Sequence, residues 1–236
     1  ERIPFIMDKR RKDNLLIDRI LKTSKNNLFN LGVIGYQSHY VDKRILSYFD
    51  KQHFEYLRLG QIRKNLEETE PIIRDADMVA MNLSVLKKIE VPGCEIASPS
   101  GIFTEDACQL SYYVGMSDKL TSFGLFGFDA DKDIKHQTAQ VVAQILWYFL
   151  YGYYNRKHDY PISMGNFTEY VVDFKKHQYQ ITFWKSNRSD RWWMEVPVKD
   201  KRQRRHRLIP CSYQDYLQAS REELPERLLA AYRRFG

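Results

Sequence analysis

Side chains that could do chemistry gather where the predicted strands end. Polar residues follow the first, third and fourth apolar runs of the chain, and they include Gln37, His39, Asn82, Ser84 and Asp129. Because the carboxyl ends of parallel strands meet at one edge of a sheet, where ligands bind in such folds, we expect these residues to line one candidate pocket. His39, with Asp42 three residues on, could act as a metal ligand or a base, although a lone histidine here is more often a surface residue.

Three further groups have a chemical and a structural interpretation. The alternating aspartates of Asp129–Asp133 resemble the start of a calcium loop, but the required glycine and distal glutamate are absent, which favours capping of a helix N-terminus. Cys108 could be a nucleophile only beside a histidine base, and the sequence places none there. Trp192–Trp193 could stack on a base or ring, while packing in a small core is the simpler interpretation.

The elements that must position these residues alternate along residues 1–160. Apolar runs predict strands, and amphipathic or apolar segments predict helices. The predicted strands are 28–35, 55–59, 77–83 and 120–128, and the predicted helices are 12–24, 42–51, 61–75, 104–115 and 134–154. This alternation indicates an α/β domain, with a three-layer, mostly parallel sheet flanked by helices.

The pattern changes after Pro161. Three short strands are predicted at 167–174, 178–184 and 191–196, followed by a basic run at 201–207 and a helical end. Within that end, Ser212 and Asp215 have the spacing of a capping box. Residues 161–236 therefore predict a small α+β extension.

Several segments follow one another in the order of a known family. Residues 81–86, MNLSVL, precede loops at 91–93 and 98–102, and residues 121–130 read TSFGLFGFDA. They resemble the Ser-Phe-Asp-x-Asp strand, Pro-Gly loop and final strand of the ureohydrolases, the family of arginase, agmatinase and formimidoylglutamase. The turn at 34–37 resembles the family's Ile-Gly-x-Arg element. Residues 162–236, with RWWME and IPCSY, resemble the extension of a bacterial formimidoylglutamase-like subgroup.

The resemblance implies metal-assisted hydrolysis, in which two Mn²⁺ ions share a hydroxide that attacks a guanidinium or amidine carbon. Such a pair needs several carboxylates to offset the repulsion between its cations. Asn82 and Ser84 stand at the positions of the family's two aspartates, and Gly127 stands where a glutamate orients the substrate. None of the three is anionic. We therefore expect a degenerate metal site, and no manganese cofactor in this chain although active relatives use it.

The family's Asp-x-His-x-Asp and Gly-Gly-Asp-His motifs are also absent from the sequence. In the family they lie upstream of the matching strands. We expect the chain to begin inside or just after the first motif, with residues 1–4 as its remnant.

Charge and cysteine content limit the partners and the compartment. The net charge of +7 comes from residues 1–27 (+4) and 199–236 (+5), while the segment between them carries −2. A nucleic-acid groove through the body is therefore disfavoured, although the run 201–207 could contact phosphate. The three cysteines are far apart, which predicts a reducing cytoplasm, and no apolar run is long enough for a membrane span.

Three functions remain open at this point. The first is a catalytically degenerate ureohydrolase-like protein that acts by ligand binding or assembly. The second is an active metal-dependent C–N hydrolase of formimidoylglutamate or another guanidine or amidine. The third is a nucleic-acid-binding module that uses the basic ends. Because ureohydrolases form trimers or hexamers, the resemblance also implies a homo-oligomer.

Overall fold

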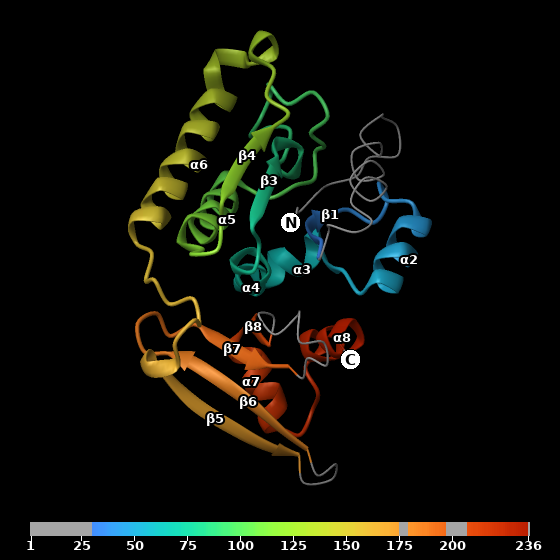
Figure 1. Cartoon of the computed structure of the whole chain (residues 1–236). Coiled ribbons are helices and arrows are strands. Elements are labelled where there is room, and N and C mark those ends of the chain that lie inside the picture. Colours follow the sequence, from blue (N-terminus) through green and yellow to red (C-terminus); the bar gives the residue numbers. More distant parts are fainter. Residues whose placement is uncertain (1–29, 175–178, 197–206, 236) are drawn as a thin grey trace. The chain divides into compact units, whose positions relative to one another are not determined.

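The computed structural model describes residues 30–174, 179–196 and 207–235 (Figure 1). The chain divides into two compact units, residues 1–156 and residues 157–236. The predicted helix at 12–24, and the basic run at 201–207 except its last residue, lie outside the described residues.

The strands of unit 1 are parallel and form two pairs. They are β1 (Gly32–Tyr36), β2 (Glu55–Arg58), β3 (Met78–Asn82) and β4 (Ser122–Phe126). β1 pairs with β2, and β3 pairs with β4 in an unbroken register from Met78 opposite Ser122 to Asn82 opposite Phe126. The predicted parallel strands are therefore present.

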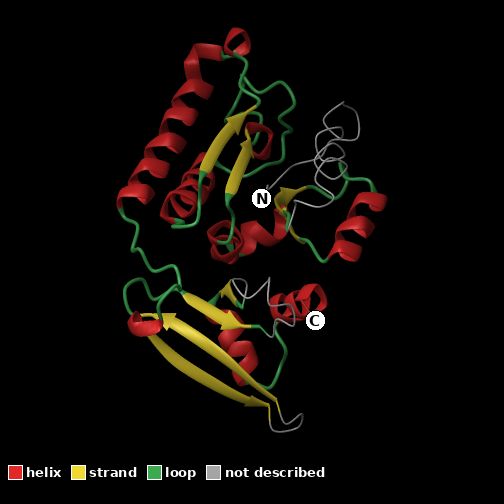
Figure 2. Cartoon of the chain, viewed as in Figure 1, coloured by secondary structure: helices red, strands yellow, loops and turns green. Residues whose placement is uncertain are grey.

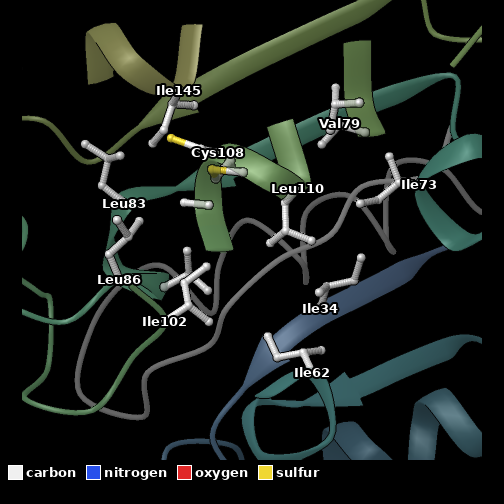
Figure 3. Close-up of a cluster of buried hydrophobic side chains, with 14 of the residues drawn as sticks. Ile34, Ile62, Ile73, Val79, Leu83, Leu86, Ile102, Cys108, Leu110 and Ile145 are labelled. Atoms are coloured by element: carbon white, nitrogen blue, oxygen red, sulfur yellow. The ribbon is translucent and has the colours of Figure 1, made fainter. Parts of the chain in front are cut away.

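Helices lie on both faces of these strands. They are α2 (Lys43–Gln52), α3 (Leu59–Lys64), α4 (Glu70–Arg74), α5 (Thr104–Met116) and α6 (Gln137–Tyr154). Alternate residues of β1 and β3 face opposite sides, as strand geometry requires. Val33 joins a buried cluster with Phe49 of α2, while Ile34 and Val79 join a second cluster formed with α3 to α6 (Figure 3). This is the three-layer α/β arrangement that the sequence predicted.

The single helix predicted over 61–75 is wrong. The segment consists of α3, a 3₁₀ turn η1 (Leu66–Thr69) and α4. The break lies at Asn65, whose backbone is extended (φ −152°, ψ 96°) and whose side-chain oxygen accepts a hydrogen bond from the Glu67 N–H. An asparagine that caps the next turn in this way competes with continuation of the helix.

Other short 3₁₀ turns join the main elements. They are η2 (Leu83–Val85), η3 (Ala130–Lys132), η4 (Ile134–His136) and η5 (Met164–Asn166). Two of them flank the predicted strand ends: η2 follows β3 directly, and η3 begins four residues after β4 ends.

The helices α5 and α6 pack with their backbones close together. A Cβ built on Gly115 would lie 2.1 Å from the Phe149 carbonyl oxygen, and one on Gly152 would lie 2.3 Å from that of Tyr112. Both contacts are far shorter than van der Waals distance, so only glycine fits at this crossing. Ser111 adds a hydrogen bond from its hydroxyl to the Ile145 carbonyl at 2.8 Å.

Unit 2 is an antiparallel sheet with two helices (Figure 2). Its strands are β5 (Phe167–Phe174), β6 (Tyr179–Ser186), β7 (Trp192–Glu195) and β8 (Leu208–Cys211), in that order. Its helices are α7 (Tyr213–Ser220) and α8 (Glu226–Phe235). The predicted capping box is confirmed, because Ser212 and Asp215 exchange side-chain to backbone hydrogen bonds. The sequence did not predict β8.

None of the helices in the described part of the chain combines the length and apolar character that crossing a membrane requires.

Candidate functional site

The ladder between β3 and β4 brings two of the expected site positions together. Asn82 is the last residue of β3 and lies opposite Phe126, the residue before Gly127. A Cβ built on Gly127 would lie 2.9 Å from Asn82 Oδ1 and 3.5 Å from Cys94 Sγ. Asn82, Ser84 and Gly127 therefore form one small cluster at the carboxyl end of this strand pair, with the buried Cys94 beside it.

Asn82 uses its side chain to cap the turn that follows. Its Oδ1 accepts a hydrogen bond from the backbone N–H of Ser84 at 2.9 Å, which starts the 3₁₀ turn η2. Ser84 is buried, with 8% of its surface exposed. The Asn82 side-chain oxygen therefore helps to hold the turn that follows β3.

Gly127 has a backbone that disfavours a side chain. Its φ is +86°, in the left-handed region where residues other than glycine are strained. Asn82 Oδ1 also occupies the space next to its Cα. A glutamate at this position would therefore meet both backbone strain and a close contact.

A small apolar cavity lies against this cluster. It measures about 40 Å³ and is lined by Asn82 together with Ile34, Val79, Met81 and other apolar residues of β3, α5 and their neighbours. Pockets that bind small molecules usually measure several hundred Å³. This cavity has room for a few water molecules but not for an amino-acid substrate.

Gln37 and His39 follow β1 but have different surroundings. The buried Gln37 amide donates to the Ser98 hydroxyl at 3.2 Å and to the Ser100 carbonyl at 2.9 Å, so it holds the loop 98–100 in place. His39 is exposed and its ring contacts that of Tyr40 in a tilted arrangement, with 4.1 Å between the ring centroids and 47° between the planes. Gln37 is thus placed as a loop anchor, and His39 as a surface residue on an exposed turn.

The aspartates that follow β4 cap turns. Asp129 accepts a hydrogen bond from the Asp131 N–H at 3.2 Å, and Asp133 accepts from the Thr138 and Ala139 N–H groups at the start of α6. Burial of the Asp133 carboxyl opposes ionisation, but the hydrogen bonds from Thr138 and Ala139 together lower its pKa below the usual value. The capping interpretation is confirmed. The backbone N–H of Asp129 also donates a hydrogen bond to the Gly93 carbonyl of the neighbouring loop.

Cys108 is buried and is not activated. Burial raises the pKa of its thiol to about 11, and the charge of Glu105 adds to the effect. A thiol of this kind is protonated at neutral pH and is a poor nucleophile.

The residues at the expected metal positions do not fit a pair of Mn²⁺ ions. Asn82 and Ser84 are neutral, the Asn82 oxygen is already bonded, and Gly127 has no side chain. Within residues 30–174, 179–196 and 207–235, His, Cys, Asp and Glu form no group of three or more that could hold a metal. A pair of hard divalent cations favours anionic oxygen ligands, and Asn82, Ser84 and Gly127 supply none.

Comparison with known proteins identifies the fold. The solved structure of formimidoylglutamase from Bacillus subtilis is 18% identical, with a TM-score of 0.56 over 66% of this chain and 52% of that one. Arginase from Bacillus caldovelox has a TM-score of 0.51 at 14% identity, over 63% of this chain and 60% of that one. The chain has the arginase fold. The resemblance to the ureohydrolases is thereby confirmed at the level of the fold.

Two further comparisons agree with this arginase-fold assignment. A Trypanosoma cruzi formiminoglutamase, solved with Mn²⁺, has a TM-score of 0.56 at 13% identity, over 66% of this chain and 55% of that one. In sequence, formimidoylglutamase from Bacillus subtilis (strain 168) is 21% identical over 90 residues, 37% of this chain and 28% of the relative. No family model matches the sequence. The chain spans about half the length of the solved relatives.

Cys94 is a neighbour of the cluster that sequence reasoning missed. Its thiol lies beside Gly127, and its carbonyl accepts a hydrogen bond from Lys88 Nζ at 2.7 Å. The sequence signal for it was only its place after the Pro92–Gly93 turn. A cysteine in a loop is usually interpreted as a small apolar residue, and its contact with a later strand depends on the fold.

Proposed function

We propose that this arginase-fold chain has a degenerate dimanganese site and does not hydrolyse guanidines or amidines, but acts by ligand binding or assembly. The observation that carries the proposal is the cluster of Asn82, Ser84 and Gly127. All three residues are neutral. Asn82 caps the turn after β3 and Gly127 has a positive φ, so these two residues have structural roles that need no metal.

The proposal is tested by metal content. The chain is purified, incubated with Mn²⁺, passed through a desalting column and measured by elemental analysis, with the Bacillus subtilis formimidoylglutamase as a positive control. We expect less than about 0.1 Mn²⁺ per chain, because without carboxylates the site cannot offset the charge of two cations. Stoichiometric manganese in this chain would overturn the proposal.

The second candidate is an active hydrolase of formimidoylglutamate or a related amidine. It is favoured by the names of the relatives, because the solved structures with similar folds include two formimidoylglutamases and an arginase. Formamide and urea release is measured with added Mn²⁺ on a panel of guanidines and amidines. Release that requires Mn²⁺ would establish this candidate, and absence of release with all substrates would remove it.

A homo-oligomer is supported by an exposed face of α6. This helix has 18 residues and none of them is charged. One side presents six large apolar or aromatic side chains that are 43–82% exposed: Leu146, Trp147, Leu150, Tyr151, Tyr153 and Tyr154. Soluble monomers rarely leave such a continuous apolar patch uncovered. We call these six residues the α6 face.

A second copy of the chain is the occupant that we propose for the α6 face. The exposed part of the six side chains amounts to on the order of 700 Å². A stable dimer buries about 800 Å² on each partner, so two α6 faces supply most of an interface. Two identical faces without charge can also meet across a two-fold axis without repulsion.

A further inference from the structure

Unit 2 contains an aromatic pocket outside the cluster described above. It has a volume of about 500 Å³ and is lined by Tyr170, Lys185, Asp190, Trp192, Tyr213 and Tyr216. Tyr170 belongs to β5, Lys185 to β6 and Trp192 to β7, while Tyr213 and Tyr216 stand one turn apart at the start of α7. The volume is in the range of pockets that bind a small organic molecule.

Three of the rings form a compact triangle, because Trp192 and Tyr213 are themselves 5.6 Å apart between centroids, with planes inclined by 38°. Trp192 and Tyr216 have centroids 4.8 Å apart and planes inclined by 23°, and Tyr216 and Tyr213 have centroids 5.9 Å apart with the same inclination. Trp192 is buried, whereas Tyr213 is 49% exposed. The ring cluster therefore has a buried member, Trp192, and a partly open member, Tyr213.

The fourth ring, that of Tyr170, forms a side wall. Its centroid lies 5.0 Å from that of Trp192 at 44° and 5.6 Å from that of Tyr216 at 66°. Tyr170 thus adds a fourth, inclined ring to the cluster. The partly exposed ring of Tyr213 is the surface on which a flat group can stack.

A donor and an acceptor lie together at the edge of the pocket. Lys185 pairs with Trp192 in the β6–β7 ladder, and its Nζ lies 2.7 Å from Asp190 Oδ1. Asp190 stands in the turn before β7 with φ +59°. The hydrogen bond to Asp190 raises the pKa of Lys185 above its usual value. The edge therefore offers a cationic donor next to an anionic acceptor.

We propose that this pocket binds a flat heteroaromatic ring of the nucleobase type. The ring would stack beside Tyr213, and its polar edge would meet Lys185 and Asp190. Stacking on aromatic side chains favours any base, because each has a π-face. The adjacent donor and acceptor favour rings that carry an acceptor next to an amino or imino group.

A cationic ligand is the competing interpretation, because tyrosine and tryptophan rings attract cations over their faces. One feature opposes it. Lys185 places a positive charge at the rim, where it would repel a second cation.

The experiment uses the full chain and the four ribonucleosides as probes. Saturation-transfer-difference NMR at millimolar nucleoside gives the bound protons and the dissociation constant, and adenosine monophosphate and a short single-stranded oligonucleotide separate a free ligand from a base in a polymer. We expect the base protons to receive more saturation than the ribose protons. Absence of transfer to every nucleoside, or transfer to tetramethylammonium ion in their place, would overturn the proposal.

Variants of Tyr213 connect the signal to the pocket. Tyr213→Ala is expected to weaken binding about tenfold, since base stacking on an aromatic side chain contributes on this scale. Tyr213→Phe is expected to bind within about twofold of the wild type, because the ring remains. Tyr48→Ala removes an exposed tyrosine from α2 of unit 1 and should leave nucleoside binding unchanged. Equal binding by the Ala and Phe variants of Tyr213 would contradict the proposal.

Discussion

At the scale of single residues, Asn82 shows how a neutral side chain at a strand end can have a structural role. An asparagine oxygen accepts the Ser84 N–H as an aspartate would, so the turn after β3 forms without a metal. Gly127 is the reverse case. Its positive φ and its contact with Asn82 disfavour any side chain at this position. The Asn82 side chain therefore fits beside a glycine at position 127 and would be in close contact with any larger residue there.

The capping role of Asn82 gives a stability prediction. Asn82→Ala should lower the free energy of unfolding by about 1 kcal/mol, as loss of a helix cap usually does. Asn82→Asp keeps the acceptor and should stay within about 0.5 kcal/mol of the wild type. Urea denaturation followed by circular dichroism measures both. Equal losses in the two variants would show that the oxygen does not act as a cap.

At the scale of elements, the crossing of α5 and α6 depends on two glycines. Gly115→Ala or Gly152→Ala would place a methyl group against a backbone carbonyl, and each should cost about 2–3 kcal/mol through forced separation of the helices. Thermal and chemical denaturation measure the loss.

Gly60→Ala is the matched control for these variants. A Cβ at Gly60 in α3 would have no heavy atom within 4 Å. This variant should gain about 0.5–1 kcal/mol, because alanine loses less backbone entropy in a helix. Destabilisation of similar size at all three glycines would contradict the packing explanation.

The segment that enters unit 2 is held by a buried ion pair. Asp159 is buried and pairs with Arg191, and the Ser189 hydroxyl donates to it as well. Burial alone would raise the pKa of Asp159, but Arg191 and the hydrogen bonds outweigh it and lower the pKa below its usual value. A lowered carboxyl pKa stabilises the folded state above the unfolded pKa of about 4, and this stability is lost as the pH falls through the folded pKa.

Asp159→Asn should therefore cost about 2 kcal/mol at pH 7 and less at pH 3. The measurement is the unfolding free energy of the wild type and the variant between pH 7 and pH 3. Asp173→Asn, an exposed change of the same chemistry in β5, is the control and should change little at any pH. A loss for Asp159→Asn that does not depend on pH would contradict the role of its charge.

Across the elements, sequence reasoning succeeded where local pattern decides and failed where distant contacts decide. The parallel strands and helices of unit 1 follow apolar runs and amphipathic segments, so their order was predictable. Asn65 broke a predicted helix because its side chain bonds the backbone, and β8 was missed because Leu208–Cys211 is short, contains Pro210 and follows a basic run. Pairing with β7 makes that segment a strand.

The site was predictable only in part for the same reason. The resemblance placed Asn82, Ser84 and Gly127 at matching positions, and the β3–β4 ladder brings them together. The aromatic pocket in unit 2 could not be found from sequence, because its rings come from three elements between Tyr170 and Tyr216. Trp192–Trp193 gave the only signal, and only the fold shows that Trp192 reaches the pocket while Trp193 packs on Phe167.

At the scale of the whole molecule, the α6 face is the surface for which we predict self-association, because α6 carries no charged residue. We expect the chain to sediment as a dimer in analytical ultracentrifugation at about 50 µM, well above the micromolar Kd that contact areas of this size permit. Trp147→Lys combined with Tyr154→Lys should shift it to a monomer, because the two-fold pairing would bring like charges together in a desolvated interface. Ile162→Lys, an 88% exposed apolar residue of unit 2, is the control and should leave the dimer intact. A monomeric wild-type chain would contradict self-association and would assign the face to a different polypeptide, and a double variant that remains dimeric would place the interface elsewhere.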